Sequence, residues 1–265
     1  MRSPSLAEII EVIERRYDPA TAAEWDRVGL VVGDPSARIE RVLFAVDPVM
    51  VTIDQAIAIR ADLLLTHHPL FLRPVHSVAA TTWKGALAHR LIKSDCALYT
   101  AHTNADLAAP GVSDALADAL GIATTGALTE SGLGRVGRIP EPMKLRDFVA
   151  KIRASIPISA AGIRVAGDPE RLIESVALCA GAGDDLFDEV RVSGVDVYLT
   201  SDLRHHPITE ALQGGAPAII DAGHFATEWP WLAQAARLLI SDLEAIGASV
   251  EVEVSNINTD AWSNV

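Results

Sequence analysis

Most of the histidines of this chain lie just after short apolar segments of the kind that form buried strands. Six of the eight have this position, and two carboxylic acids, Asp106 and Glu228, each follow one of them by four residues. In open α/β sheets, ligands bind at the carboxyl ends of the strands. Imidazole and carboxylate together suit Zn, Fe, Mn, Co or Ni better than Mg or Ca, which prefer oxygen ligands. The pattern therefore predicts a divalent-metal site at one edge of a sheet.

The first set of these residues comes from the first half of the chain, and each member also has an ordinary structural interpretation. Consecutive histidines such as His67 and His68 can be a strand cap and a solvated side chain. Asn104 and Asp106, in the loop expected after His102, can simply satisfy the backbone of a turn. Metal binding is therefore inferred from the whole set rather than from any one motif.

The second set comprises His224 and Glu228, whose spacing of four would place them on one face of a helical turn. Pro230 argues against that geometry, because proline is tolerated only in the first turn of a helix. We therefore expect the last long helix, about 230–246, to begin near Glu228, with His224 in the entering loop. The ordinary role of Glu228 would be that of a first-turn acid favoured by the helix dipole.

The remaining candidates carry less chemistry. Arg204 beside His205 and His206 would oppose a cation, so we expect these two histidines to form a pocket wall or an interface, whereas His76 and His89 have no motif around them. No Gly-x-Ser-x-Gly elbow is present and neither cysteine has an electropositive setting, so a nucleophilic triad is not supported.

A glycine-rich stretch, Gly181-Ala182-Gly183-Asp184-Asp185, follows a predicted strand. Its backbone N–H groups could receive an anion at a helix start. A lone glycine turn after a strand is more often a tight crossover, and the sequence leaves both interpretations open.

The elements that position these residues alternate between strands and helices. Apolar runs at 42–46, 63–66 and 97–100 are separated by helical stretches at about 53–60 and 84–93. This alternation is typical of βαβ units and a largely parallel buried sheet.

A turn-rich stretch, Gly126 to Gly137, interrupts this pattern and is the best candidate for a domain boundary. The elements expected after it are helices at 145–154, 207–213 and 230–246 and strands at 175–179, 195–200, 218–220 and 249–254. We predict an α/β protein of two related lobes with largely parallel sheets. The first lobe comprises 1–128 plus 223–265 and the second comprises 129–222, with no additional inserted domain.

The two lobes are called related because the chain contains a weak internal sequence repeat. Residues 62–69 (DLLLTHHP) are matched by 196–200 (DVYLT) and, after a four-residue insertion, by 205–207 (HHP). The repeat continues at the next predicted strand ends, where Ala101-His102 is matched by Gly223-His224.

Composition excludes several classes of partner and location. The 35 acidic against 22 basic side chains give a net charge of −13, which repels nucleic-acid phosphate and anionic lipid. Cys96 and Cys179 lie far apart among apolar residues, so a disulfide framework is not expected. We therefore expect the protein in the reducing cytoplasm. No signal peptide or membrane span is predicted, because apolar runs of ~20 residues are absent.

Taken together, the motifs resemble the family named for the yeast NGG-one-interacting factor three, whose bacterial members carry the name GTP cyclohydrolase 1 type 2 homolog. The resemblance covers nearly the whole chain. The motifs that carry it are Glu24-Trp25-Asp26-Arg27-Val28-Gly29-Leu30, Thr66-His67-His68-Pro69, Ala101-His102-Thr103-Asn104-Ala105-Asp106, the glycine-rich stretch, Thr200-Ser201-Asp202, and Gly223-His224 with Thr227-Glu228.

The resemblance implies a dinuclear metal site in the cleft between the two lobes and assembly into a hexamer. Two divalent metal ions per chain, of unknown identity, are expected. Carried over by position, their ligands are His67, His68, Asp106, His224 and Glu228. The catalytic residue expected beside them is His102, as a group supporting the metals or as a proton shuttle.

Two functions from different classes follow. The first is a metal-dependent hydrolase acting on a nucleotide or phosphoester-type small molecule. The alternative is a non-catalytic metal-binding regulatory, chaperone or scaffold protein. Under either, the mean hydropathy of +0.24 together with a net charge of −13 favours a homo-oligomer that covers apolar surface.

Overall fold

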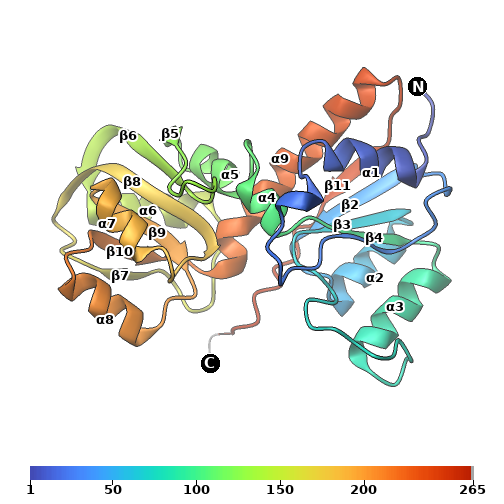
Figure 1. Ribbon diagram of the computed structural model, residues 1–265, viewed down its shortest axis with the longest axis horizontal. Helices are drawn as coiled ribbons and strands as arrows, with labels where there is room; N and C mark the ends of the chain where they lie inside the picture. The colour runs from blue at the N-terminus through green and yellow to red at the C-terminus, as the bar shows by residue number, and fades with distance from the viewer. Residues whose placement is uncertain (264–265) are drawn as a thin grey trace. The chain divides into compact units, whose positions relative to one another are not determined.

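The chain folds into two compact units, seen in a computed structural model that describes residues 1–263 (Figure 1). Unit 1 comprises Met1–Ala108 and Leu232–Thr259, and unit 2 comprises Ala109–Trp231 and the described residues from Asp260 onward. No helix within residues 1–263 has the combined length and apolarity that a membrane span requires.

The unit boundaries differ from those expected from the sequence. The first lies at residue 108 rather than 128, because β5 (Ala123–Gly126) pairs with β6 (Arg135–Lys144) in the second sheet. The second lies inside helix α9 (His224–Ala245), between Trp231 and Leu232, rather than at residue 223. A turn rich in glycine therefore marks a hairpin here and not a change of domain.

Unit 1 contains a five-stranded sheet of order β1-β4-β3-β2-β11. Its strands are β1 (Gly29–Val32), β2 (Arg41–Ala45), β3 (Leu63–Thr66), β4 (Ala97–Thr100) and β11 (Glu251–Val254). β4, β3, β2 and β11 run parallel, and β1 pairs antiparallel with β4. The predicted largely parallel sheet is confirmed here, and β2 is the partner of the C-terminal strand, which the sequence did not identify.

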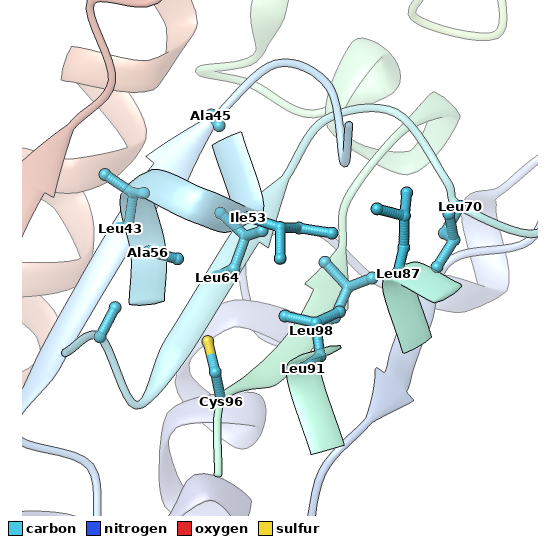
Figure 2. Packing of buried hydrophobic residues seen from close by; sticks show 11 residues of the cluster. Leu43, Ala45, Ile53, Ala56, Leu64, Leu70, Leu87, Leu91, Cys96 and Leu98 are labelled. Atoms are coloured by element: carbon cyan, nitrogen blue, oxygen red, sulfur yellow. The ribbon is translucent and has the colours of Figure 1, made fainter. Parts of the chain in front are cut away.

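Helices cover both faces of this sheet (Figure 1). The helical segments of this unit are α1 (Leu6–Glu14), the 3-10 turn η1 (Pro19–Thr21), α2 (Met50–Ala58), α3 (Trp83–Lys93), α4 (Thr103–Leu107) and the end of α9. On one face, Ile53 of α2 and Leu87 and Leu91 of α3 pack against Leu64 and Leu98 of the strands (Figure 2). Burial on both faces explains why these strands read as unbroken apolar runs.

Unit 2 contains a six-stranded sheet of order β5-β6-β8-β9-β10-β7. The strands not yet named are β7 (Arg164–Ala166), β8 (Leu172–Ala182), β9 (Val197–Ser201) and β10 (Ala218–Asp221). Only β8, β9 and β10 run parallel, and the other three pairings are antiparallel. The prediction of a largely parallel sheet was wrong for this unit, because a short turn can join β5 to β6 only as an antiparallel hairpin.

Helix α9 begins six residues before its proline, at His224, and Pro230 lies inside it. The expectation that His224 lies in an entering loop was therefore wrong. The Gly223 carbonyl accepts the N–H of Thr227, whose hydroxyl bonds back to the carbonyl of His224. These bonds close the first turn, and burial of the following Trp231 outweighs the one backbone bond that proline cannot make.

The other helices of unit 2 are α5 (Val112–Ala119), α6 (Leu145–Ser155), α7 (Phe187–Ser193) and α8 (His205–Gln213). α8 starts two residues earlier than expected. His205 and His206 consequently form its first turn instead of lying at a strand end.

The internal sequence repeat corresponds to an arrangement of three parallel strands that both units share, the strand frame. Asp62 accepts hydrogen bonds from the N–H groups of Glu40 and Arg41 at the start of β2, and Asp196 accepts the equivalent bonds from Glu174 and Ser175 in β8. Each aspartate thus secures the strand beside it. β2-β3-β4 and β8-β9-β10 are parallel triplets built in the same way.

Candidate metal centre

Three histidines of unit 1 converge at the carboxyl ends of β3 and β4. His67 and His68 follow β3 directly, and His102 follows β4. One ring nitrogen from each lies within 4.8 Å of the others, and the ring centroids are 5.1 to 5.5 Å apart. The parallel pairing of the two strands produces this convergence, as strand-end placement predicted.

Each of these histidines has its Nδ1 atom held by an oxygen acceptor. Nδ1 of His67 lies 3.0 Å from the Ala101 carbonyl oxygen, that of His68 lies 2.7 Å from Asp47, and that of His102 lies 2.8 Å from Asp26. A carbonyl or carboxylate only accepts, so Nδ1 carries the proton and the Nε2 lone pair is the one available to a cation. Metal-binding histidines in proteins are characteristically oriented in this way.

Asp106 lies on the single turn of α4, with its Oδ1 atom 3.8 Å from Nε2 of His67. Asp106 was expected in a loop, and that expectation was wrong. The neighbouring Asn104 has the structural role considered for it, since its side chain accepts the His102 N–H and donates to the carbonyl of Tyr17. The structure therefore separates a candidate ligand from a turn-forming residue within one motif.

Asp26 and Asp47 are site residues whose role sequence reasoning missed. Asp26 also accepts from the backbone N–H and the hydroxyl of Thr103, at 3.0 and 2.5 Å. Burial raises the pKa of Asp26, but the hydrogen bonds from His102 and Thr103 outweigh it and hold the pKa well below the ordinary value. Asp47 directly follows the apolar run 42–46, so the strand-end rule could have found it, whereas no spacing signals Asp26.

Unit 2 contributes His224 and Glu228 from the first turns of α9. Nε2 of His224 lies 2.9 Å from Oε1 of Glu228, and its Nδ1 lies 2.8 Å from Oδ2 of Asp202. Burial lowers the pKa of His224, but the charge of Glu228 and then the hydrogen bond to Asp202 raise it to about 11. Two anionic groups thus flank one imidazole, which makes this a favourable position for a cation.

Gly181 provides the space that the Glu228 carboxylate occupies. Its φ of +72° lies in the left-handed region, and a Cβ atom there would lie 2.4 Å from Oε1 of Glu228. Its N–H donates to the Thr227 hydroxyl, and its carbonyl accepts from Thr200 and Ser201. The glycine-rich stretch is therefore a closely packed crossover against the α9 turn.

His205 and His206 stay apart from the histidine group of unit 1. Their rings lie 5.3 Å from each other in the first turn of α8, and both residues are exposed. Arg204 beside them pairs with Asp184 at 2.6 Å. In the described part of the chain neither belongs to a group with metal-binding geometry.

The fold and the site together define a mixed α/β protein of two sheets with His and Glu side chains that can hold a metal. The donors fit a divalent transition ion, because imidazole Nε2 atoms are directed by second hydrogen bonds and carboxylates lie beside them. The family model described as Duf34/NIF3 (NGG1p interacting factor 3) matches residues 4–261, and the chain belongs to this family.

Named relatives agree with this assignment. A Streptomyces coelicolor protein called GTP cyclohydrolase 1 type 2 homolog is 48% identical over 98% of this chain and 94% of its own length. A Clostridium acetobutylicum protein of the same name is 31% identical over 98% of both chains. The crystal structure of a Bacillus cereus protein related to NIF3 covers all of both chains with a TM-score of 0.92 at 23% identity, which supports the fold.

Proposed function

We propose that this chain binds two divalent metal ions and uses them in hydrolysis. One observation carries the metal proposal: His67, His68 and His102 each have Nδ1 held by an oxygen acceptor, so each leaves its Nε2 lone pair available to a cation. Three histidines oriented in the same way are difficult to explain as surface or packing residues.

The proposed ligands of unit 1 are His67, His68 and Asp106, joined by His102. The expectation from sequence made His102 a supporting group or proton shuttle. Its ring nitrogen lies within the same 4.8 Å group as those of the other two histidines, which favours direct ligation. Asp26 accepts the hydrogen bond from Nδ1 of His102 and so holds the His102 ring in the tautomer whose Nε2 can bind a metal.

In unit 2, His224 and Glu228 are the proposed ligands, and Asp202 orients the imidazole. A dinuclear centre formed from the two sets is our proposal from the family resemblance. Bound divalent ions supply Lewis acidity, which activates water and polarises an electrophile. The chain's own residues orient the ligands, hold the Nδ1 protons and, through Gly181, admit the Glu228 carboxylate.

The proposed substrate class is a nucleotide or phosphoester, supported by the name that the relatives carry. The test is a panel of nucleotides and phosphoesters assayed with Mn, Zn or Fe loading. We expect turnover by the wild type and its loss in His68→Ala. Metal retention without any turnover would instead support the non-catalytic regulatory, chaperone or scaffold function.

Assembly into a homo-oligomer, a hexamer by resemblance, also stays a proposal. Exposed apolar side chains such as Ile92, Leu172 and Val192 are consistent with surface that a second copy covers. Light scattering should give a mass well above the monomer's 28.2 kDa, and a monomer at micromolar concentration would contradict it.

A further inference from the structure

Trp25 is an exposed aromatic residue beside the histidines of unit 1. It is 59% exposed, and its ring centroid lies 6.0 Å from that of His102 at an interplanar angle of 77°. The two rings meet edge to face and are not stacked in parallel. A large apolar side chain is thus left in contact with water directly next to the proposed ligands.

The segment that carries Trp25 is held firmly from both sides. The following residue, Asp26, has a completely buried side chain that bonds His102 and Thr103. On the other side, the N–H of Ala23 donates to the Thr103 hydroxyl at 3.0 Å. The indole therefore stands on a short backbone stretch tied to the loop that supplies His102.

Arg27 completes this support without competing for the indole. Its guanidinium bonds the backbone carbonyls of Glu24 and Asp26 and so folds back on its own segment. An exposed aromatic ring on a preorganised segment binds a planar ligand with little loss of conformational entropy. Every nucleobase has a π-face that such a ring can stack on.

We propose that Trp25 is a substrate-positioning residue whose indole stacks on a planar heteroaromatic ring of the substrate. This inference rests on the proposed function and adds to it that the substrate class is heteroaromatic, as a nucleotide is and a simple phosphoester is not. The stacking face and the metal ligands are joined through one side chain, Asp26, which bonds His102 and flanks Trp25.

The chain offers a matched control. Trp83, at the start of α3, is 63% exposed, close to the exposure of Trp25, and belongs to the same unit. Its ring contacts the amino group of Lys84, 5.4 Å from the ring centroid, and it has no contact with the proposed ligands among the ring interactions of the described residues. Replacing Trp83 removes equal apolar surface without touching the proposed site.

The experiment measures binding of guanosine 5′-monophosphate and of ribose 5-phosphate to full-length protein loaded with Mn²⁺ or Zn²⁺, by calorimetry. Trp25→Ala should weaken binding of the nucleotide about 5- to 150-fold. Trp25→Phe should retain most of the affinity, and Trp83→Ala should retain all of it. Ribose 5-phosphate, which has no base, should bind all variants equally. Metal content is measured in the same samples.

Each other outcome overturns the inference. Equal affinity of Trp25→Ala and wild type for the nucleotide, equal weakening of both probes, or no binding of the nucleotide to the metal-loaded wild type would each exclude stacking on Trp25. In these cases intact metal content leaves the proposed metal function standing. A wild type that binds no metal would overturn the proposed function and this inference together.

Discussion

The triplets β2-β3-β4 and β8-β9-β10 share a backbone frame but carry different residues at their strand ends. The Thr66 carbonyl accepts the N–H of Ala101, and the Thr200 carbonyl accepts that of Ala222. In this register Ser201 and Asp202 stand at the positions of His67 and His68.

The histidine of the second unit, His224, occupies a different position in the strand frame from the histidines of the first. Gly223 stands where unit 1 has His102, so His224 lies one residue beyond the equivalent position and begins a helix. Asp202 orients that histidine, whereas unit 1 takes its orienting acids from Asp26 and Asp47. The comparison teaches that the scaffold is repeated while the candidate ligands at each strand end are set residue by residue.

The largest expected effect concerns the glycine that admits Glu228. Gly181→Ala combines a positive φ with a Cβ only 2.4 Å from Oε1 of Glu228, so it should lower the free energy of unfolding by about 3 kcal/mol. Gly194→Ala is the matched control, because Gly194 has φ +69° but open space around it. Urea unfolding measures both, and equal losses would show that the contact with Glu228 contributes nothing.

The next effect distinguishes the two orienting acids. Asp26→Asn should weaken metal affinity about 10- to 100-fold, the usual cost of losing a carboxylate that orients a ligating histidine. Asp202→Asn should cost less, because the side chain of Asp202 is 56% exposed and that of Asp26 is fully buried, so water can replace only the former. Asparagine also tolerates the positive φ of Asp202. Chelator competition measures both, and a larger loss for Asp202→Asn would contradict the account.

A smaller effect sharpens the equivalence of the two frames. Asp62→Ala and Asp196→Ala should each lower the free energy of unfolding by about 2 kcal/mol, because each carboxylate accepts two backbone N–H groups. Exposed Asp188→Ala, which removes a surface ion pair with Arg191 and one first-turn acid of α7, should change it by less than about 1 kcal/mol. A large loss in only one of the two frames would break the equivalence.

The Asp196 contribution should also depend on pH. Burial raises the pKa of Asp196, but hydrogen bonds from the Glu174 N–H and the Ser175 hydroxyl outweigh it and leave the pKa below the ordinary 3.8. A lowered folded-state pKa stabilises the fold above pH 3.8, and this stabilisation is lost as the pH falls below it. The difference between wild type and Asp196→Ala should therefore be constant from pH 5 to 7 and shrink below about pH 4.

The smallest expected effect is a difference in the number of protons released when metal binds. Because the pKa of His224 is raised to about 11 by Glu228 and Asp202, this imidazole is protonated at pH 7.5 in the metal-free protein. A metal must displace that proton. Calorimetry in buffers of different ionisation enthalpy should show about one proton more released by the wild type than by His224→Ala. Equal release would contradict the proposed ligation.

Much of this architecture could be predicted from the sequence. The strands of unit 1 have continuous apolar runs because both sheet faces are buried, and the strand-end rule brought His67, His68 and His102 together. The start of α9 could not be predicted, because tertiary packing around Trp231 overrides the local preference of Pro230. The sequence similarity of His205-His206 to His67-His68 was likewise misleading, because His205 and His206 lie in a helix and not at a strand end.

Long-range hydrogen bonds explain the other omissions. Asp26 reaches His102 across 76 residues, and no local pattern records such a contact. The antiparallel half of the second sheet was missed because short apolar runs do not reveal strand direction. Asp202 reaches His224 across 22 residues, and its sequence motif alone gave it no role.

Metal content of purified variants tests the central claim most directly. Wild type and His89→Ala, whose exposed histidine lies on α3 and belongs to neither ligand set, should each bind two divalent ions per chain after loading and desalting. His68→Ala and Glu228→Ala should each lose at least one ion, because each removes a proposed ligand from one unit. Stoichiometric metal retained in both variants would contradict the assignment of these residues as ligands.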